Sequence, residues 1–179
     1  MARIFNKGYL PEFVYGGIDG SITTFAMVAG AAGASFGPTV VLILGFANII
    51  ADGFSMAVSN FLAIKSESEL ITKGGNSGPN SIAMKHPFKA AIITFFSFLL
   101  LGVIALLPFI FPDILNINKF CCSVILTGFS LALVGAVKGF VTKKSYIRSA
   151  LETLIIGGIA AGLAYVVGLW LSSLGISQI

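Results

Sequence analysis

The sequence TVVLILGFANIIADGFSMAVSNFLAI occupies residues 39–64 and holds one charged side chain, Asp52. A helix that crosses a bilayer needs roughly 20 predominantly apolar residues, so this stretch is long enough to span a membrane. Pro38 precedes it, and proline suits the first turn of a helix, where the N–H that it lacks would have no intrahelical partner. The stretch therefore predicts a transmembrane helix with an acid in its interior.

The rest of the chain resembles this stretch in composition. Only 10% of the 179 residues are charged and 56% are hydrophobic, whereas about 25% of the residues of a soluble domain are charged. Helices can place such a chain in lipid because they satisfy their backbone hydrogen bonds internally. We predict an all-α membrane protein, a single transmembrane domain over residues 1–179 with a cytoplasmic loop at residues 65–87. Residues 65–72 can continue the second helix beyond the bilayer, because no helix breaker precedes Gly74. The five expected transmembrane helices are residues 13–33, 39–64, 88–111, 120–141 and 149–174.

The basic residues indicate the orientation of the chain. Lysine and arginine concentrate in short cytoplasmic loops, and in a five-helix arrangement every basic residue except Lys119 lies on one side. We expect the N-terminus in the cytoplasm and the C-terminus across the membrane. The net charge of +4 is explained by this bias, so we expect no nucleic-acid partner. The bias does not distinguish a plasma or inner membrane from the membrane of a vacuole-like organelle.

Residues suited to catalysis are scarce, so we do not expect an enzyme. The single histidine, His86, lies at a predicted membrane boundary, and the adjacent Cys121 and Cys122 have no evident base nearby. The glycine-rich run at residues 74–81 lacks the lysine and the serine or threonine that end a phosphate-binding loop. We also expect no resident cofactor.

Two acids lie well inside predicted helices, Asp19 and Asp52. Placing an acid there costs about 2.5–3.5 kcal/mol on insertion scales, which makes a functional role the first hypothesis. The structural alternative is a hydrogen bond to a neighbouring helix. The five other acids lie near predicted helix ends or in loops, where we expect solvated charges; they are Glu12, Glu67, Glu69, Asp113 and Glu152.

Each interior acid belongs to a row of potential metal ligands. Residues four apart lie on one helix face, drifting by only about 40° per step. The carboxylates, amides, hydroxyl and thioethers of these two rows can all donate electron pairs to a cation. One row holds Asn48, Asp52, Met56 and Asn60, and the other holds Asp19, Thr23 and Met27.

The ligand types indicate the cargo. Oxygen ligands alone suit magnesium or calcium, while a thioether shifts the preference toward softer transition metals. Neither row contains histidine or cysteine, which argues against zinc or copper and favours Fe²⁺ or Mn²⁺. Protons compete with metal ions for the same carboxylates, and this competition is the minimal chemistry of a proton-coupled antiporter. Two alternatives stay open: a passive metal-permeable channel, and a non-transporting scaffold in which the aspartates hold helices together.

Two segments resemble the vacuolar iron transporter family. They are YGGIDGSITTFAMVAG at residues 15–30 and ADGFSMAVSNFLAIKSE at residues 51–67, and RSALE at residues 148–152 fits as well. The resemblance implies a five-helix homodimer with the metal path between subunits, lined by the first two helices. It also implies transport of Fe²⁺, often Mn²⁺, out of the cytosol in exchange for protons, with Asp19 and Met56 on the path.

The sequence departs from the family pattern at two places. Asn60 stands where many members carry glutamate, and the glutamate- and methionine-rich insert between the second and third helices is missing. Glu67 and Glu69 are candidates for what is left of a cytoplasmic metal-binding site. Lys138, near the cytoplasmic end of the fourth helix, can extend its ammonium group toward the interface.

Overall fold

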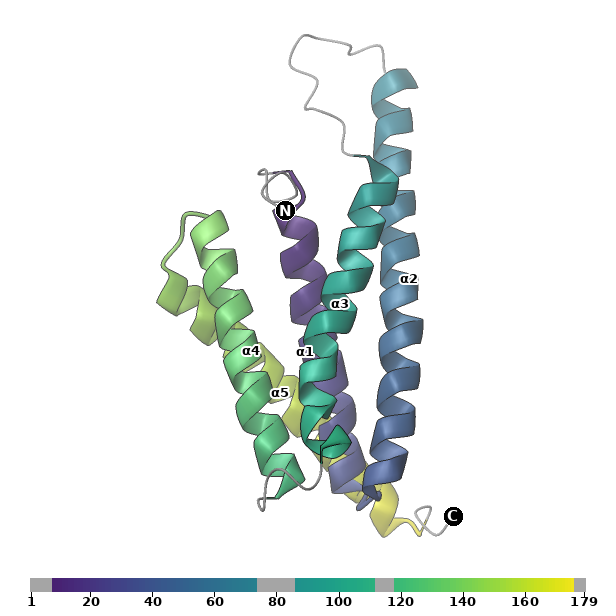
Figure 1. Cartoon of the computed structure of the whole chain (residues 1–179), viewed down its shortest axis with the longest axis vertical. Coiled ribbons are helices and arrows are strands. Elements are labelled where there is room, and N and C mark those ends of the chain that lie inside the picture. Colours follow the sequence, from purple (N-terminus) through teal and green to yellow (C-terminus); the bar gives the residue numbers. More distant parts are fainter. Residues whose placement is uncertain (1–7, 74–85, 112–117, 176–179) are drawn as a thin grey trace.

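The computed structural model describes residues 8–73, 86–111 and 118–175, in which the only regular elements are five α-helices. The predicted number of helices and the all-α class are confirmed. The helices run up and down in a bundle, with the N-terminal end of α1 and the C-terminal end of α5 at opposite ends (Figure 1). In chain order they are α1 (Leu10–Gly33), α2 (Pro38–Lys73), α3 (Pro87–Ile110), α4 (Lys119–Val141) and α5 (Tyr146–Ser173).

Proline begins three of these helices, as expected from the sequence. Pro11 lies in the first turn of α1, and Pro38 and Pro87 are the first residues of α2 and α3. Within the connection predicted over residues 65–87, α2 continues to Lys73, as the absence of a helix breaker before Gly74 allows. Residues 65–73 contain good helix formers and neither glycine nor proline, so nothing stops the helix where the apolar stretch ends. Residues 74–85 of the predicted loop, and Asp113, lie outside the described residues.

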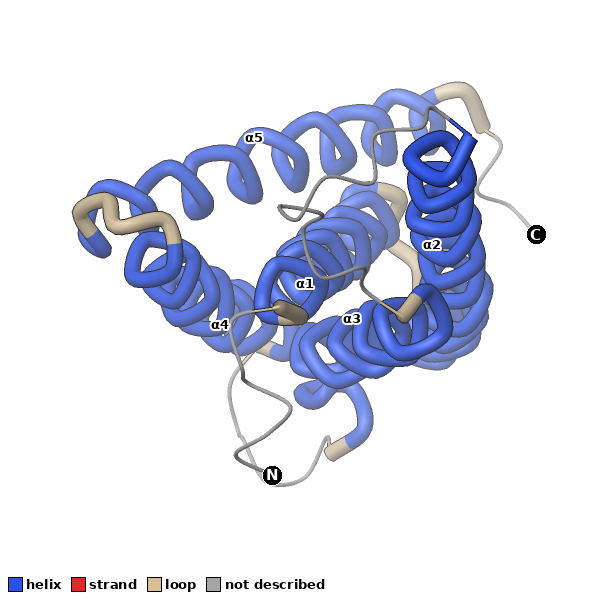
Figure 2. Tube along the Cα trace, turned by 90° about the horizontal axis from the view of Figure 1, so that it is seen from above, coloured by secondary structure: helices blue, strands red, loops and turns tan. Residues whose placement is uncertain are grey.

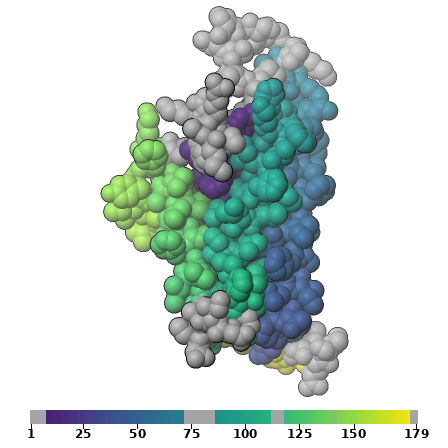
Figure 3. Space-filling model, viewed as in Figure 1, coloured from purple at the N-terminus to yellow at the C-terminus, as the bar shows by residue number. Residues whose placement is uncertain are grey.

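α1 is the central helix of the bundle. It packs against all four other helices, whereas among the described residues α2 contacts only α1 and α3, and α5 contacts only α1 and α4. Figure 2 shows this arrangement from above, with α1 in the middle of the other four helices. On the face shown in Figure 3, α3 and α4 cover most of α1.

Four described helices, α2 to α5, are long and apolar enough to cross a membrane; α1 is not among them. The protein is therefore a multi-pass membrane protein, but the prediction of five spans is supported for four of them. α1 falls short because polar side chains and glycines dilute its apolar residues, including Asp19 and the fully buried Ser21 and Thr24. Its neighbours shield it from the surroundings, so its composition need not be that of a lipid-facing helix.

Small residues allow α1 to approach its neighbours closely. A side chain on Gly20 would collide with the backbone of Phe98 in α3, and one on Gly168 of α5 would collide with the carbonyl oxygen of Gly30. Small residues at such positions are typical of helix contacts in membranes. An apolar cluster between α1, α2 and α3, which includes Ile49 and Leu106, completes the core.

Candidate functional site

The two interior aspartates lie on neighbouring helices, Asp19 on α1 and Asp52 on α2, and both are half-buried. They are close enough for their carboxylates to repel each other electrostatically. Among the described residues, neither carboxylate accepts a hydrogen bond or pairs with a cation. The structural alternative, in which each acid anchors a neighbouring helix, thus finds no contact to support it in the described part of the chain.

Asp19 lines a cavity of about 410 Å³ between the first half of α1 and the end of α4. Its walls are mostly apolar, but Lys138 contributes from α4 and Tyr15 from α1. Tyr15 precedes Asp19 by four residues and therefore shares its helix face. A carboxylate in a cavity with apolar walls is poorly solvated, which makes it a strong ligand for any cation that enters.

A second cavity, of about 340 Å³, adjoins the first at Tyr15, which lines both. Its other walls come from α2 and are more polar; they are Ser55, Met56, Ser59, Asn60 and Ala63. Hydroxyl, amide and thioether groups thus face one space next to the Asp19 cavity. Two of the predicted ligands on α2, Met56 and Asn60, are brought together in this second cavity.

The two asparagines of the α2 row differ in their contacts. The Nδ2 of Asn60 donates a hydrogen bond to the Oγ1 of Thr94 in α3 at 2.8 Å, which leaves the amide oxygen of Asn60 for another partner. The Nδ2 of Asn48 is buried and has no partner among the described residues. Since the two ends of an amide are hard to tell apart, turning the Asn48 amide would present its oxygen at the same point.

The row of candidate ligands on α1 supplies fewer groups to these two cavities than the sequence predicts. The Thr23 hydroxyl donates to the backbone oxygen of Asp19 at 2.8 Å, so its proton is already committed. Met27 packs against the apolar core cluster and lines a different, apolar cavity of about 430 Å³ next to α5. Asp19 is thus the member of this row that lies in the cavity next to the α2 ligands.

Glu67 and Glu69 lie on the final turns of α2, and both are exposed. Residues two apart point in directions about 200° apart on a helix, so the two carboxylates do not converge. No group of three or more histidine, cysteine or acidic side chains is placed to hold a metal ion in the described ranges. Glu12, expected to be solvated, is instead 7% exposed in the first turn of α1, where helical N–H groups favour negative charge.

Sequence reasoning missed some of these cavity residues. Tyr15 extends the α1 row backward by one step, and Ser55 and Ser59 lie beside Met56 and Asn60 on α2, so the i+4 spacing could have found them. Lys138 and Glu152 were both named from the sequence, but their ion pair was not predicted, because it depends on how α4 packs on α5.

Comparisons with known proteins agree on one family. The profile of the VIT family matches residues 10–76 and 71–169. The chain is 25% identical to a vacuolar iron transporter of Centaurea cyanus, over 86% of this chain and 84% of that protein. It is 36% identical to a vacuolar iron transporter of Toxoplasma gondii over 37% of this chain and 22% of that protein.

The lengths of these alignments bear on the missing insert. The Centaurea cyanus alignment runs over 210 positions, more than the 179 residues of this chain, so that relative has segments that this chain lacks. The alignment with vacuolar iron transporter homolog 4 of Arabidopsis thaliana runs over only 166 positions, at 26% identity over 88% of this chain and 81% of that protein. Relatives whose alignments contain many or few additional positions therefore match the same bundle.

Proposed function

The chain belongs to the VIT family of vacuolar iron transporters, and we propose that it carries Fe²⁺ or Mn²⁺ out of the cytosol in exchange for protons. A transporter of this kind is not an enzyme. The observation that carries the proposal is the pair Asp19 and Asp52, two half-buried, interacting carboxylates without a partner among the described residues. Such groups are costly within a membrane protein unless a cation neutralises them.

The metal path runs along the two adjoining cavities. Asp19 supplies a carboxylate in the first, Met56 a thioether and Asn60 an amide oxygen in the second. Asp52, on the adjacent helix, lines neither cavity but interacts electrostatically with Asp19. This mixture of hard and soft ligands suits Fe²⁺ or Mn²⁺ better than magnesium. When the metal leaves, protons neutralise the same carboxylates, and this exchange couples the two fluxes.

The working unit is a homodimer with the path between two copies. Ser55, Ser59 and Tyr15 line the second cavity but are exposed in one copy, and polar side chains on a membrane helix avoid lipid. A second copy covering this face would shield them and double the number of acids near the metal. Five spans place the N-terminus in the cytoplasm, with the polar α1 crossing the bilayer inside the bundle.

The test is metal flux into proteoliposomes that contain the purified full-length protein, with and without a pH gradient. Asp19→Asn and Asp52→Asn should each abolish Mn²⁺ flux, while Ser97→Ala should leave it unchanged because the Ser97 hydroxyl bonds only within its own helix. Normal flux in both aspartate variants would refute the proposal. Flux that ignores the pH gradient would refute proton coupling and favour the passive channel.

A further inference from the structure

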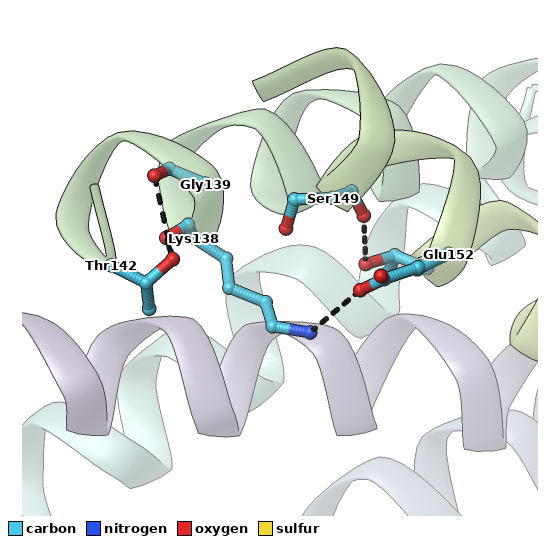
Figure 4. Close-up of polar contacts among 6 residues, drawn as sticks. Lys138, Gly139, Thr142, Ser149 and Glu152 are labelled. Carbon is cyan, nitrogen blue, oxygen red and sulfur yellow. Dashed lines mark hydrogen bonds and ion pairs between the residues drawn. The ribbon is translucent and has the colours of Figure 1, made fainter. Parts of the chain in front are cut away.

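Lys138 lies in the last turn of α4, and its Nζ is 4.0 Å from the Oε2 of Glu152 in α5. Figure 4 shows the lysine side chain extending from α4 over the ribbon of α1 to meet this carboxylate. The side chains are 38% and 52% exposed, and a distance of 4.0 Å is the outer limit for an ion pair. Exposed pairs of this kind contribute at most about 1 kcal/mol, so this one is easily broken.

The same lysine lines the cavity that contains Asp19. One flexible ammonium group therefore has two acids in its surroundings, an exposed one at Glu152 and a half-buried one at Asp19. Lysine is suited to exchange between partners because its charge is compact and its four-carbon stem has several rotatable bonds. Asp19, in contrast, forms no ion pair among the described residues, where Lys138 is instead paired with Glu152.

We propose that Lys138 is a tethered counter-ion shared between Glu152 and Asp19, and that it competes with the metal for Asp19. This inference rests on the proposed function, since it assigns a regulator to the same carboxylate. When metal is bound, Glu152 holds the ammonium group away from Asp19. When the metal has left, the ammonium group moves toward Asp19 and compensates part of its charge.

A purely structural ion pair makes a different prediction. Its only task would be to hold α4 against α5, which already pack closely: a side chain on Gly135 would meet Ala150, and one on Gly139 would meet Tyr146, each within 3.0 Å of the added atom. Removing either charge would then have the same effect on the protein. A shared counter-ion instead predicts that the two substitutions act in opposite directions.

The experiment is equilibrium Mn²⁺ binding to the purified full-length protein in lipid nanodiscs. Lys138→Met should tighten binding, because it removes the competitor, and Glu152→Gln should weaken it, because it releases Lys138 to Asp19. Each shift should be about fivefold, the upper range for an exposed charge pair. Glu152→Gln in the Lys138→Met background should have no further effect, and Lys138→Arg, which keeps the charge, should stay near wild type.

Shifts in the same direction, or no shift in either single variant, would overturn the shared counter-ion. Melting temperatures of all variants identify any that fail to fold. If Lys138→Met fails to fold, the Mn²⁺ affinities of the two single variants Lys138→Arg, which keeps the charge, and Glu152→Gln are compared instead. Failure of the proposed function looks different. In that case wild-type protein binds no Mn²⁺, or Asp19→Asn binds it as well as wild type does, and both proposals fall together.

Discussion

The contact between α1 and α3 at Gly20 allows a stability prediction with a matched control. A Cβ on Gly20 would collide with the Phe98 carbonyl oxygen and lie 2.9 Å from its Cα and 3.0 Å from its carbonyl carbon. Ordinary contacts begin at 3.4 Å, and all three atoms belong to the backbone. No side-chain rotation can relieve the clash, so in Gly20→Ala the two helices have to separate.

The cost follows from two opposing effects. Overpacking costs about 1–3 kcal/mol, while replacing glycine with alanine within a helix gains up to about 1 kcal/mol. We expect Gly20→Ala to lose about 1–2 kcal/mol of folding free energy. For a chain of this size each kcal/mol lowers the melting temperature by about 2–4 °C. The loss should also reduce metal flux, because Asp19 precedes Gly20 and moves with it.

The control variant is Gly162→Ala on α5, where an added Cβ has nothing within 4 Å. It gains the same helix propensity without a clash, so its melting temperature should equal or exceed that of wild type. The measurement is thermal unfolding of both purified variants in the same detergent. If Gly20→Ala proves as stable as Gly162→Ala, the close approach of α1 to α3 is wrong, and so is the position it gives to Asp19.

Three further predictions concern the candidate site. Thr94→Val should lower the free energy of unfolding by about 0.5–1.5 kcal/mol, because it leaves the Asn60 amide without its hydrogen-bond partner. In a double-mutant cycle, Asn60→Ala should then cost less in the Thr94→Val background than it does alone. Fully additive costs would contradict the hydrogen bond. Asp52→Asn or Asp19→Asn should raise the melting temperature of metal-free protein, because each relieves repulsion between the two acids. Each should also remove any stabilisation by added Mn²⁺. A metal-free variant less stable than wild type would instead indicate a structural role for the acid. Glu67→Gln should change the Mn²⁺ flux in proteoliposomes by less than about twofold, since exposed charges are screened, and a larger loss would make Glu67 part of the path.

The sequence predicts the number of helices and most of their boundaries because two physical signals are strong. Apolar stretches of membrane-spanning length mark the helices, and prolines at residues 11, 38 and 87 mark where three of them begin. Hydropathy alone does not give the end of α2, because it indicates where the membrane-spanning stretch ends, whereas the helix continues until a breaker such as Gly74. Residues 65–73 are mostly polar and still helical.

The sequence predicts which candidate ligands share a face of one helix, but not which faces of different helices meet. Spacing along α2 grouped Met56 with Asn60, and both line one cavity, while the interior acids Asp19 and Asp52 lie on adjacent helices and interact electrostatically. Spacing also grouped Met27 with Asp19, but the structure places Met27 in an apolar cavity beside α5. Periodicity fixes the direction of a side chain from its own axis, while the helix that it meets depends on packing.

The position of α1 explains why its hydropathy is the weakest signal in the chain. A helix surrounded by four others meets lipid over little of its surface, so it can carry acids and hydroxyls that a peripheral helix could not. Asp19 itself is half-buried, and charge interactions are stronger there than in bulk water because the effective dielectric constant is lower. The proposed cation ligand Asp19 thus lies on the helix that hydropathy alone does not assign to the membrane, and enclosure of a polar helix by apolar neighbours is compatible with the proposed fifth span.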